Sequence, residues 1–123
     1  MTQATNRIGR IGEDLAVRHL QRHGFTILER NWRASFSDVR GELDIVAVEG
    51  KTLVFCEVKS RRASSSADTL AGVHWNKQRQ LRRLAALYLT TCEEHVDVRF
   101  DVVAVCWPPE GGGAEIVHVR GAF

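Results

Sequence analysis

Apolar residues recur along this chain with two spacings, which divide it into helices and strands. Helical spacing marks residues 7–23, closed by Gly24, and residues 76–91. Alternating or continuous β-branched runs predict strands at 25–32, 43–48, 53–58, 98–105 and 115–119. The expected order is therefore helix, three strands, helix, two strands. This order predicts an α/β fold in which a mixed β-sheet is flanked by two helices.

The second and third strands are joined by the short VEGKT connection and are expected to form a hairpin. Side chains alternate along a strand, so Asp44 shares a face with Glu42, and Glu57 shares a face with Lys59. On an exposed face these charges would be ordinary solvated residues. Because both helices need sheet surface to pack against, we expect the mixed face to be partly covered. Asp44, Glu57 and Lys59 would then meet in a cleft.

Carboxylates placed together in a cleft repel each other, by roughly 4 kcal/mol at about 4 Å and an effective dielectric of about 20. One lysine offsets only part of this repulsion, whereas a divalent cation removes it. Oxygen ligands without a neighbouring histidine or cysteine suit Mg²⁺ or Mn²⁺ better than zinc. Such a site best supports phosphodiester hydrolysis, with Lys59 orienting the water or stabilising charge on the phosphate.

The net charge of +2 does not by itself indicate a nucleic-acid-binding protein. The positions of the cations say more, because they flank the serine-rich segment 61–68. Arg61, Arg62 and Lys77 are expected to contact phosphates, although Lys77 could also be a snorkelling lysine. A solvated helix face accounts equally well for Arg79, Arg82 and Arg83.

Three further residues have structural alternatives. His74 and Trp75 could stack on a base, but a tryptophan that anchors the start of the second helix is the reading we favour. Asp101 shares a strand face with Arg99 and is expected to be a structural ion-pair partner.

The chain shows neither a secretory signal nor an apolar stretch long enough for a membrane span. Its three cysteines, Cys56, Cys92 and Cys106, are far apart and read as reduced core thiols. A cytoplasmic protein is expected. With 123 residues, 44% of them hydrophobic, residues 1–123 are expected to form a single domain.

Asp44 followed across the hairpin by Glu57-Val58-Lys59 resembles the core of the PD-(D/E)XK nucleases. The strings GRIGEDLAVRHLQRHGFTILERNWR, GELDIVAVEGKTLVFCEVKSR, KQRQLRRLAALYL and RFDVVAV closely resemble the UPF0102, or YraN, family. That family has been viewed as a relative of archaeal-type Holliday-junction resolvases. The resemblance implies a restriction-endonuclease-like core of order α-β-β-β-α-β. It also implies a further acid in the first helix, which falls on Glu13.

Helical geometry also favours Glu13 as the acid that points towards the sheet. Glu13 lies inside the inward arc that begins at Ile11 and Leu15, whereas Asp14 lies outside it. An acid near a helix start, placed there by the helix dipole, is the alternative for either residue.

These patterns together predict a Mg²⁺- or Mn²⁺-dependent endonuclease that hydrolyses DNA, at branched or flapped structures, by shape rather than by sequence. Glu13, Asp44 and Glu57 are the expected catalytic metal ligands, Lys59 assists the attacking water, and Glu42 is an auxiliary ligand. The alternatives are a non-catalytic nucleic-acid- or protein-binding module that retains the nuclease fold, and a purely structural domain.

Oligomeric state is left open by the sequence. A junction resolvase cuts two strands symmetrically and is normally a two-fold dimer, so a homodimer is compatible with this function. The sheet edge formed by the last strands and the C-terminal VHVRGAF are the candidate surfaces.

Overall fold

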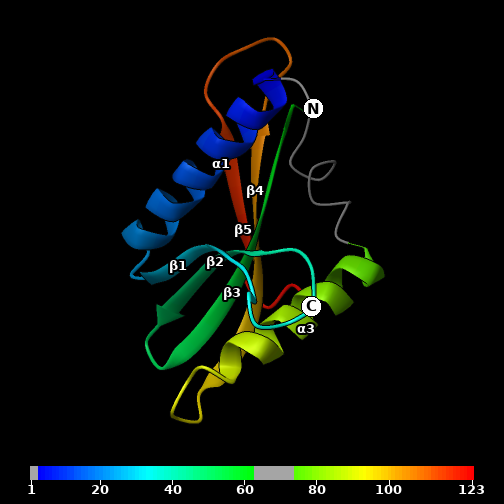
Figure 1. Cartoon of the computed structure of the whole chain (residues 1–123). Helices are drawn as coiled ribbons and strands as arrows, with labels where there is room; N and C mark the ends of the chain where they lie inside the picture. Colours follow the sequence, from blue (N-terminus) through cyan, green and yellow to red (C-terminus); the bar gives the residue numbers. More distant parts are fainter. Residues whose placement is uncertain (1–2, 63–73) are drawn as a thin grey trace.

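The computed structural model describes residues 3–62 and 74–123, and Figure 1 shows how its elements are arranged. In chain order these elements are α1 (Gln3–Arg22), β1 (Thr26–Trp32), β2 (Leu43–Glu49), β3 (Thr52–Arg62), α3 (Trp75–Leu89), β4 (Asp97–Trp107) and β5 (Glu115–Val119). The predicted order of helices and strands is confirmed. The protein is α/β, with an architecture consistent with a restriction-endonuclease-like fold.

The strands form a five-stranded sheet in the order β1-β2-β3-β4-β5. Pairing is antiparallel except between β3 and β4, so the sheet is mixed, as predicted. The parallel pair is joined through α3, the kind of crossover that parallel strands require. This pairing runs from Thr52–Asp97 to Arg62–Trp107. Arg61 and Arg62 therefore lie on β3 and not in the loop where the sequence had placed them.

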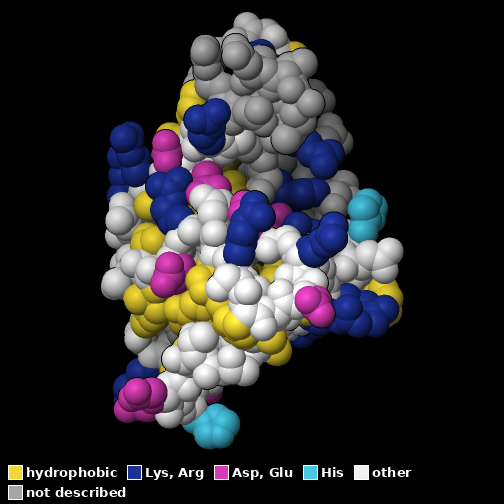
Figure 2. All heavy atoms as spheres, in the orientation of Figure 1, with side chains coloured by type: hydrophobic (Ala, Val, Ile, Leu, Met, Phe, Trp, Pro, Cys, Tyr) yellow, Lys and Arg dark blue, Asp and Glu magenta, His cyan; other side chains and the backbone are white. Residues whose placement is uncertain are grey.

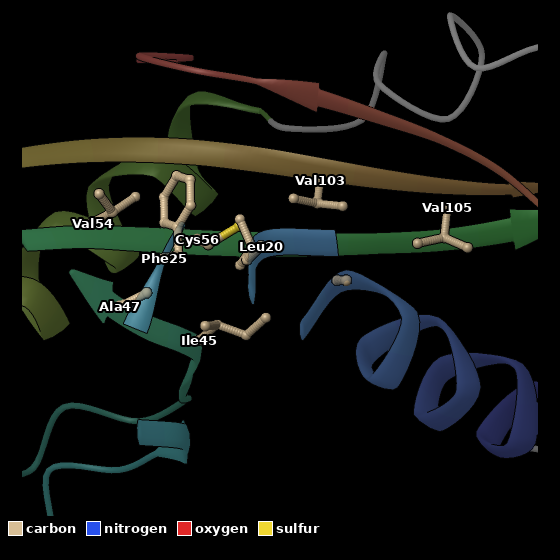
Figure 3. Packing of buried hydrophobic residues seen from close by; sticks show 9 residues of the cluster. Leu20, Phe25, Ile45, Ala47, Val54, Cys56, Val103 and Val105 are labelled. Atoms are coloured by element: carbon tan, nitrogen blue, oxygen red, sulfur yellow. The ribbon is translucent and has the colours of Figure 1, made fainter. Parts of the chain in front are cut away.

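The two helices cover opposite faces of the sheet (Figure 1). Under α1 lies a cluster of mostly small and branched side chains with one aromatic ring, which Figure 3 shows from close by: Ala16, Leu20, Phe25, Ile45, Ala47, Val54, Cys56, Val103 and Val105. Under α3 lies a second cluster, formed by Leu43, Val46, Leu53, Phe55, Leu81, Leu84, Ala85 and Tyr88. The face of β2 and β3 that carries the acids is thus covered by α3, as expected.

Helix α1 packs through most of the predicted apolar stripe, but Gly12 is buried in place of Ile11. Gly12, Ala16 and Leu20 are buried, whereas Ile11, expected to point inward, is 41% exposed. The cause is a close approach to β3: a Cβ added to Gly12 would lie 2.5 Å from the Cβ of Ser60. The absence of a side chain at residue 12 lets the helix lie directly on the strand.

Both edge strands are short, and β1 is also irregular. The pairing of β1 with β2 shifts between Ile27 and Glu29, a β-bulge of the kind that often blunts a sheet edge. Beyond β5 the chain folds back, and the Ala122 N–H donates to the Phe100 carbonyl at 2.8 Å. Phe123 stacks on Phe100 with 5.1 Å between ring centroids. The aromatic C-terminal residue is therefore packed within the chain.

The cysteines agree with the prediction of core thiols. All three are free; Cys56 and Cys106 are buried and Cys92 is partly buried. Burial and the negative charge of Asp101 raise the pKa of the Cys56 thiol well above its usual value. Of the helices that the structure describes, none combines the length and apolar character needed to span a bilayer.

Candidate active site

The sheet forks between β2 and β3 at the predicted acids. Pairing of these strands ends at Ile45–Cys56, so Asp44 and Glu57 face each other just beyond the last pair. The Val58 N–H, beyond the paired region, donates to Asp44 Oδ2 at 2.9 Å. Since β3 continues to pair with β4 as far as Arg62, only the β2 side of the strand opens. The acids therefore stand at the branching point, where ordinary strand pairing has stopped.

Glu57, which is buried, and Asp44, which is partly buried, form a carboxyl pair. Glu57 is only 9% exposed, and its Oε2 atom has no hydrogen-bond partner among the described residues. Burial, followed by repulsion from Asp44, raises the pKa of Glu57 to about 8, although Lys77 and Lys59 oppose the shift. Burial also raises the pKa of Asp44, against the hydrogen bond from Val58. The two acids titrate together, and the pair therefore retains one proton near neutral pH.

Two lysines face this pair. Lys77, near the start of α3, places its Nζ atom 3.9 Å from Glu57 Oε1, so the structure brings it to the acids as the sequence suggested. Lys59 is partly buried on β3; burial and the positive charge of Arg61 lower its pKa, while Glu57 acts in the opposite direction. Arg61 and Arg62 are exposed farther along the same strand.

Glu13 reaches the site from α1. It lines, together with Asp44 and Glu42, a cavity of about 680 Å³. The Glu13 side chain is 15% exposed and that of Asp14 is 60% exposed, which confirms that Glu13 is the acid that turns inward. Because the sheet is forked at Asp44, a residue from the α1 side and a residue of β2 can line one cavity.

The carboxylate of Glu13 is held by residues that sequence reasoning missed. Its Oε1 atom accepts hydrogen bonds from Arg30 Nε and Nη2, both at 3.1 Å, and from Asn31 Nδ2 at 2.9 Å. Asn31 has a φ of 52°, the left-handed conformation that asparagine tolerates better than most residues. The one available signal was an asparagine inside a strand-like run, which is compatible with an irregular strand.

The predicted metal ligands are therefore only partly assembled. Asp44 and Glu57 are adjacent, but Glu13 is bonded to Arg30, and Glu42 is paired with Arg33 at 3.0 Å. Within residues 3–62 and 74–123, no group of three or more His, Cys, Asp or Glu side chains is arranged to hold a metal ion. An ion at the fork would be held first by Asp44 and Glu57. The bonds from Arg30 and Asn31 all go to Oε1 of Glu13, so this acid could join the ion through Oε2 while Arg30 stays bonded.

Asp101 is a structural ion-pair partner, as predicted. It is fully buried and accepts from Arg99 Nε at 2.8 Å, Arg99 Nη2 at 2.9 Å and the Gly121 N–H at 3.0 Å. His118 Nε2 lies 2.8 Å from its Oδ2 atom. Burial raises its pKa, but the bonds from His118 and Arg99 outweigh that effect and hold the pKa well below its usual value.

Trp75 does not anchor α3 in the core, which corrects the favoured interpretation. Its side chain is 65% exposed, and the Arg79 guanidinium lies over the indole ring at 4.8 Å from the centroid. The second cluster begins only at Leu81, so the first turns of α3 extend beyond the packed part of the sheet face.

Fold and site together define an α/β protein with a forked mixed sheet and, at the fork, a carboxyl pair in which Glu57 is buried. Residues 12–105 match the model of the "Uncharacterised protein family UPF0102". The chain belongs to the UPF0102 family. The matched region contains all the predicted site residues, from Glu13 to Lys77.

Relatives in this family are similar over almost the whole chain. A UPF0102 protein of Acidothermus cellulolyticus is 47% identical over 131 residues, covering 98% of this chain and 96% of that protein. One of Frankia casuarinae is 43% identical over 123 residues, covering 98% and 99%. One of Syntrophus aciditrophicus is 40% identical over 112 residues, covering 90% and 85%.

Proposed function

We propose that this protein is a metal-dependent endonuclease that hydrolyses DNA phosphodiester bonds, acting at branched or flapped structures. The observation that carries the proposal is the carboxyl pair of Asp44 and Glu57, in which Glu57 is buried and its Oε2 atom has no hydrogen-bond partner among the described residues. Buried acids in this state destabilise a fold, since apolar residues of similar volume would pack there without a charge to desolvate. Their presence is best explained by a cation that takes the place of the retained proton.

The donor set fits Mg²⁺ or Mn²⁺. Asp44 and Glu57 offer carboxylate oxygens, including the unpartnered Oε2 atom of Glu57, and Glu13 lines the cavity on the Asp44 side. Such an ion, when bound, lowers the pKa of a water and neutralises charge on the phosphate. Arg30 would hold Glu13 in place through its Oε1 atom.

Lys59 and Lys77 complete the chemistry from the protein's side. Both act electrostatically on Glu57, so a phosphate placed at the fork lies next to two ammonium groups. Their charge stabilises the negative charge that builds up on phosphorus, and Lys59, on the same strand as Glu57, orients the attacking water. Lys and Arg side chains gather across the middle of the face between α1 and α3, with acids among them (Figure 2). Arg61 and Arg62 extend this positive charge along β3.

The test is cleavage of labelled linear, flapped and four-way-junction DNA in Mn²⁺. We expect Asp44→Asn and Lys59→Ala to lose at least about 100-fold in rate, while Glu94→Gln, a change of an exposed acid outside the site, retains it. Equal cleavage by all four proteins would point to a contaminating nuclease and would contradict the proposal.

A second readout does not depend on turnover. Mn²⁺ bound only by the folded protein raises the melting temperature. This increase should be larger at pH 8 than at pH 6, because Glu57 must lose its proton first. It should be absent in Asp44→Asn.

The non-catalytic binding module is kept as a second candidate because Glu13 and Glu42 are both engaged by arginines. DNA binding without cleavage, across metals and substrates, would favour the module.

A further inference from the structure

A second cavity, of about 530 Å³, lies between the segment 33–42 and α3, and we call it the α3 groove. It is lined by Asp38, Val39, Arg40, Asn76, Arg79, Gln80 and Arg83. Its two walls are joined by a hydrogen bond in which Gln80 Nε2 donates to the Arg40 carbonyl at 2.9 Å. The next residue, Gly41, has a φ of 98°, and a Cβ there would lie 2.5 Å from the same Gln80 atom. Gln80 therefore connects the two walls of the groove in this structure.

The groove carries positive charge that is not neutralised by neighbouring acids. Within the described parts of the chain, Arg40, Arg79 and Arg83 make no ion pair. Among the described residues, four other arginines are paired with carboxylates: Arg30, Arg33, Arg99 and Arg120. Three guanidinium groups and one acid, Asp38, line the cavity, so a net positive potential faces it. Such a surface attracts an anionic ligand.

An exposed aromatic ring stands beside these cations. Arg79 lines the groove and lies over the ring of Trp75, which is 65% exposed. Single-stranded nucleic acids are bound by this combination, because unpaired bases stack on aromatic rings while cations follow the backbone. In a duplex the bases are already stacked on one another and are not available to the indole.

We propose that the α3 groove binds a single-stranded segment of nucleic acid, with Arg40, Arg79 and Arg83 on its phosphates and Trp75 on a base. Lys77 lies on the same helix and contacts Glu57, so the segment runs towards the carboxyl pair. Between Lys77 and Arg83 the helix rises roughly 9 Å, the length of two to three stacked nucleotides. The proposal rests on the proposed function for the choice of nucleic acid, and it assigns the unpaired arm of a flapped substrate to this groove.

Fluorescence anisotropy with a labelled 12-nucleotide single strand, and a duplex of the same sequence, tests this proposal. EDTA is present throughout, so cleavage plays no part. Arg79→Ala, Arg83→Ala and Trp75→Ala are each expected to raise the Kd for the single strand about tenfold and to change duplex binding less. The control is Lys51→Ala, which removes an exposed cation at the β2–β3 turn, the end of the hairpin away from Asp44.

The salt dependence separates charge from stacking. Arg79→Ala should make the slope of log K against log salt shallower by about 0.7, whereas Trp75→Ala should leave the slope unchanged. Single-strand affinities equal to that of Lys51→Ala in all three variants would overturn the groove. A preference of the wild type for duplex, or binding of poly-glutamate with no binding of the single strand, would overturn it as well.

The outcomes for the groove and for the endonuclease are distinguishable. If the protein binds a single strand through Arg79 and Trp75 but never cleaves DNA, the endonuclease proposal fails and the proposal for the α3 groove is supported. If the wild type, Arg79→Ala and Trp75→Ala all cleave flapped DNA with the same KM, the endonuclease proposal is supported and the proposal for the α3 groove fails.

Discussion

Asp101 on β4 and Glu57 on β3 are buried acids of one sheet, and they differ in their supply of hydrogen-bond donors. Asp101 pairs in register with Cys56, one residue from Glu57, so the two acids are close neighbours on opposite faces. Asp101 is bonded by Arg99, His118 and Gly121. Glu57 has an ion pair with Lys77 at 3.9 Å and, among the described residues, an Oε2 atom without a hydrogen-bond partner. Burial alone therefore does not distinguish these two acids; the supply of hydrogen-bond donors does.

The largest effect in this comparison is expected at Asp101. Asp101→Asn removes the charge that balances Arg99 in the interior and should lower the free energy of unfolding by about 3–5 kcal/mol. Urea denaturation at pH 7 measures this loss, with Asp97→Asn, an exposed acid on the same strand, as the control. A loss as small as that of Asp97→Asn would show that the bonds to Asp101 are not structural.

Substitution of Glu57 should raise the stability of the protein, whereas substitution of Asp101 lowers it. Its pKa rises from 4.5 to about 8 on folding, so the folded state keeps a proton that the unfolded state releases between these values. The stability of the metal-free protein therefore falls as the pH rises through this range. Asp101, whose pKa is lowered, instead loses its contribution as the pH falls below 3.8.

Glu57→Gln cannot ionise and should be more stable than the wild type at pH 8, by on the order of 2 kcal/mol. The two proteins should converge near pH 5. Urea denaturation in EDTA across this range measures the difference, with Glu94→Gln as the control. Parallel pH profiles of the wild type and Glu57→Gln would mean that Glu57 is not the buried, proton-retaining acid described above.

The smallest change in stability is expected at Asn31. Two substitutions there distinguish the effect of its backbone strain from the effect of its hydrogen bond to Glu13. Asn31→Gly should change stability by less than about 0.5 kcal/mol, because glycine adopts its φ of 52° freely, whereas Asn31→Ala should cost about 1 kcal/mol. Both variants remove the bond to Glu13. Equal changes in cleavage rate would therefore assign the role to the side chain, and a change in Asn31→Ala alone would assign it to the backbone.

Local patterns were sufficient to predict much of the fold. β-branched runs identified the strands, and alternation placed Asp44 and Glu57 on one face. Helix α3, which covers that face, was predicted from the helical spacing of Leu81, Leu84 and Tyr88. These features depend on residues close together in the chain, which is why periodicity identifies them.

The parts that could not be predicted depend on contacts between distant segments. The early end of the β2–β3 pairing is a property of two strands, and the hold of Arg30 and Asn31 on Glu13 joins β1 to α1. The exposure of Trp75 depends on where the packed part of α3 begins. Neither a spacing nor a composition specifies such distances.

Because Gly12 lies against Ser60, the geometry of the site depends on a residue that has no side chain. Ser60 is itself bonded to Trp107 on β4, so the surface beneath Gly12 has little freedom to retreat. A single methyl group at residue 12 would lift this turn of α1 from the strand, and Glu13, the next residue, would be carried with it. The position of Glu13 in the site is thus set by how closely α1 lies on β3. A substitution at Gly12 could therefore disturb the site without altering any of its charges.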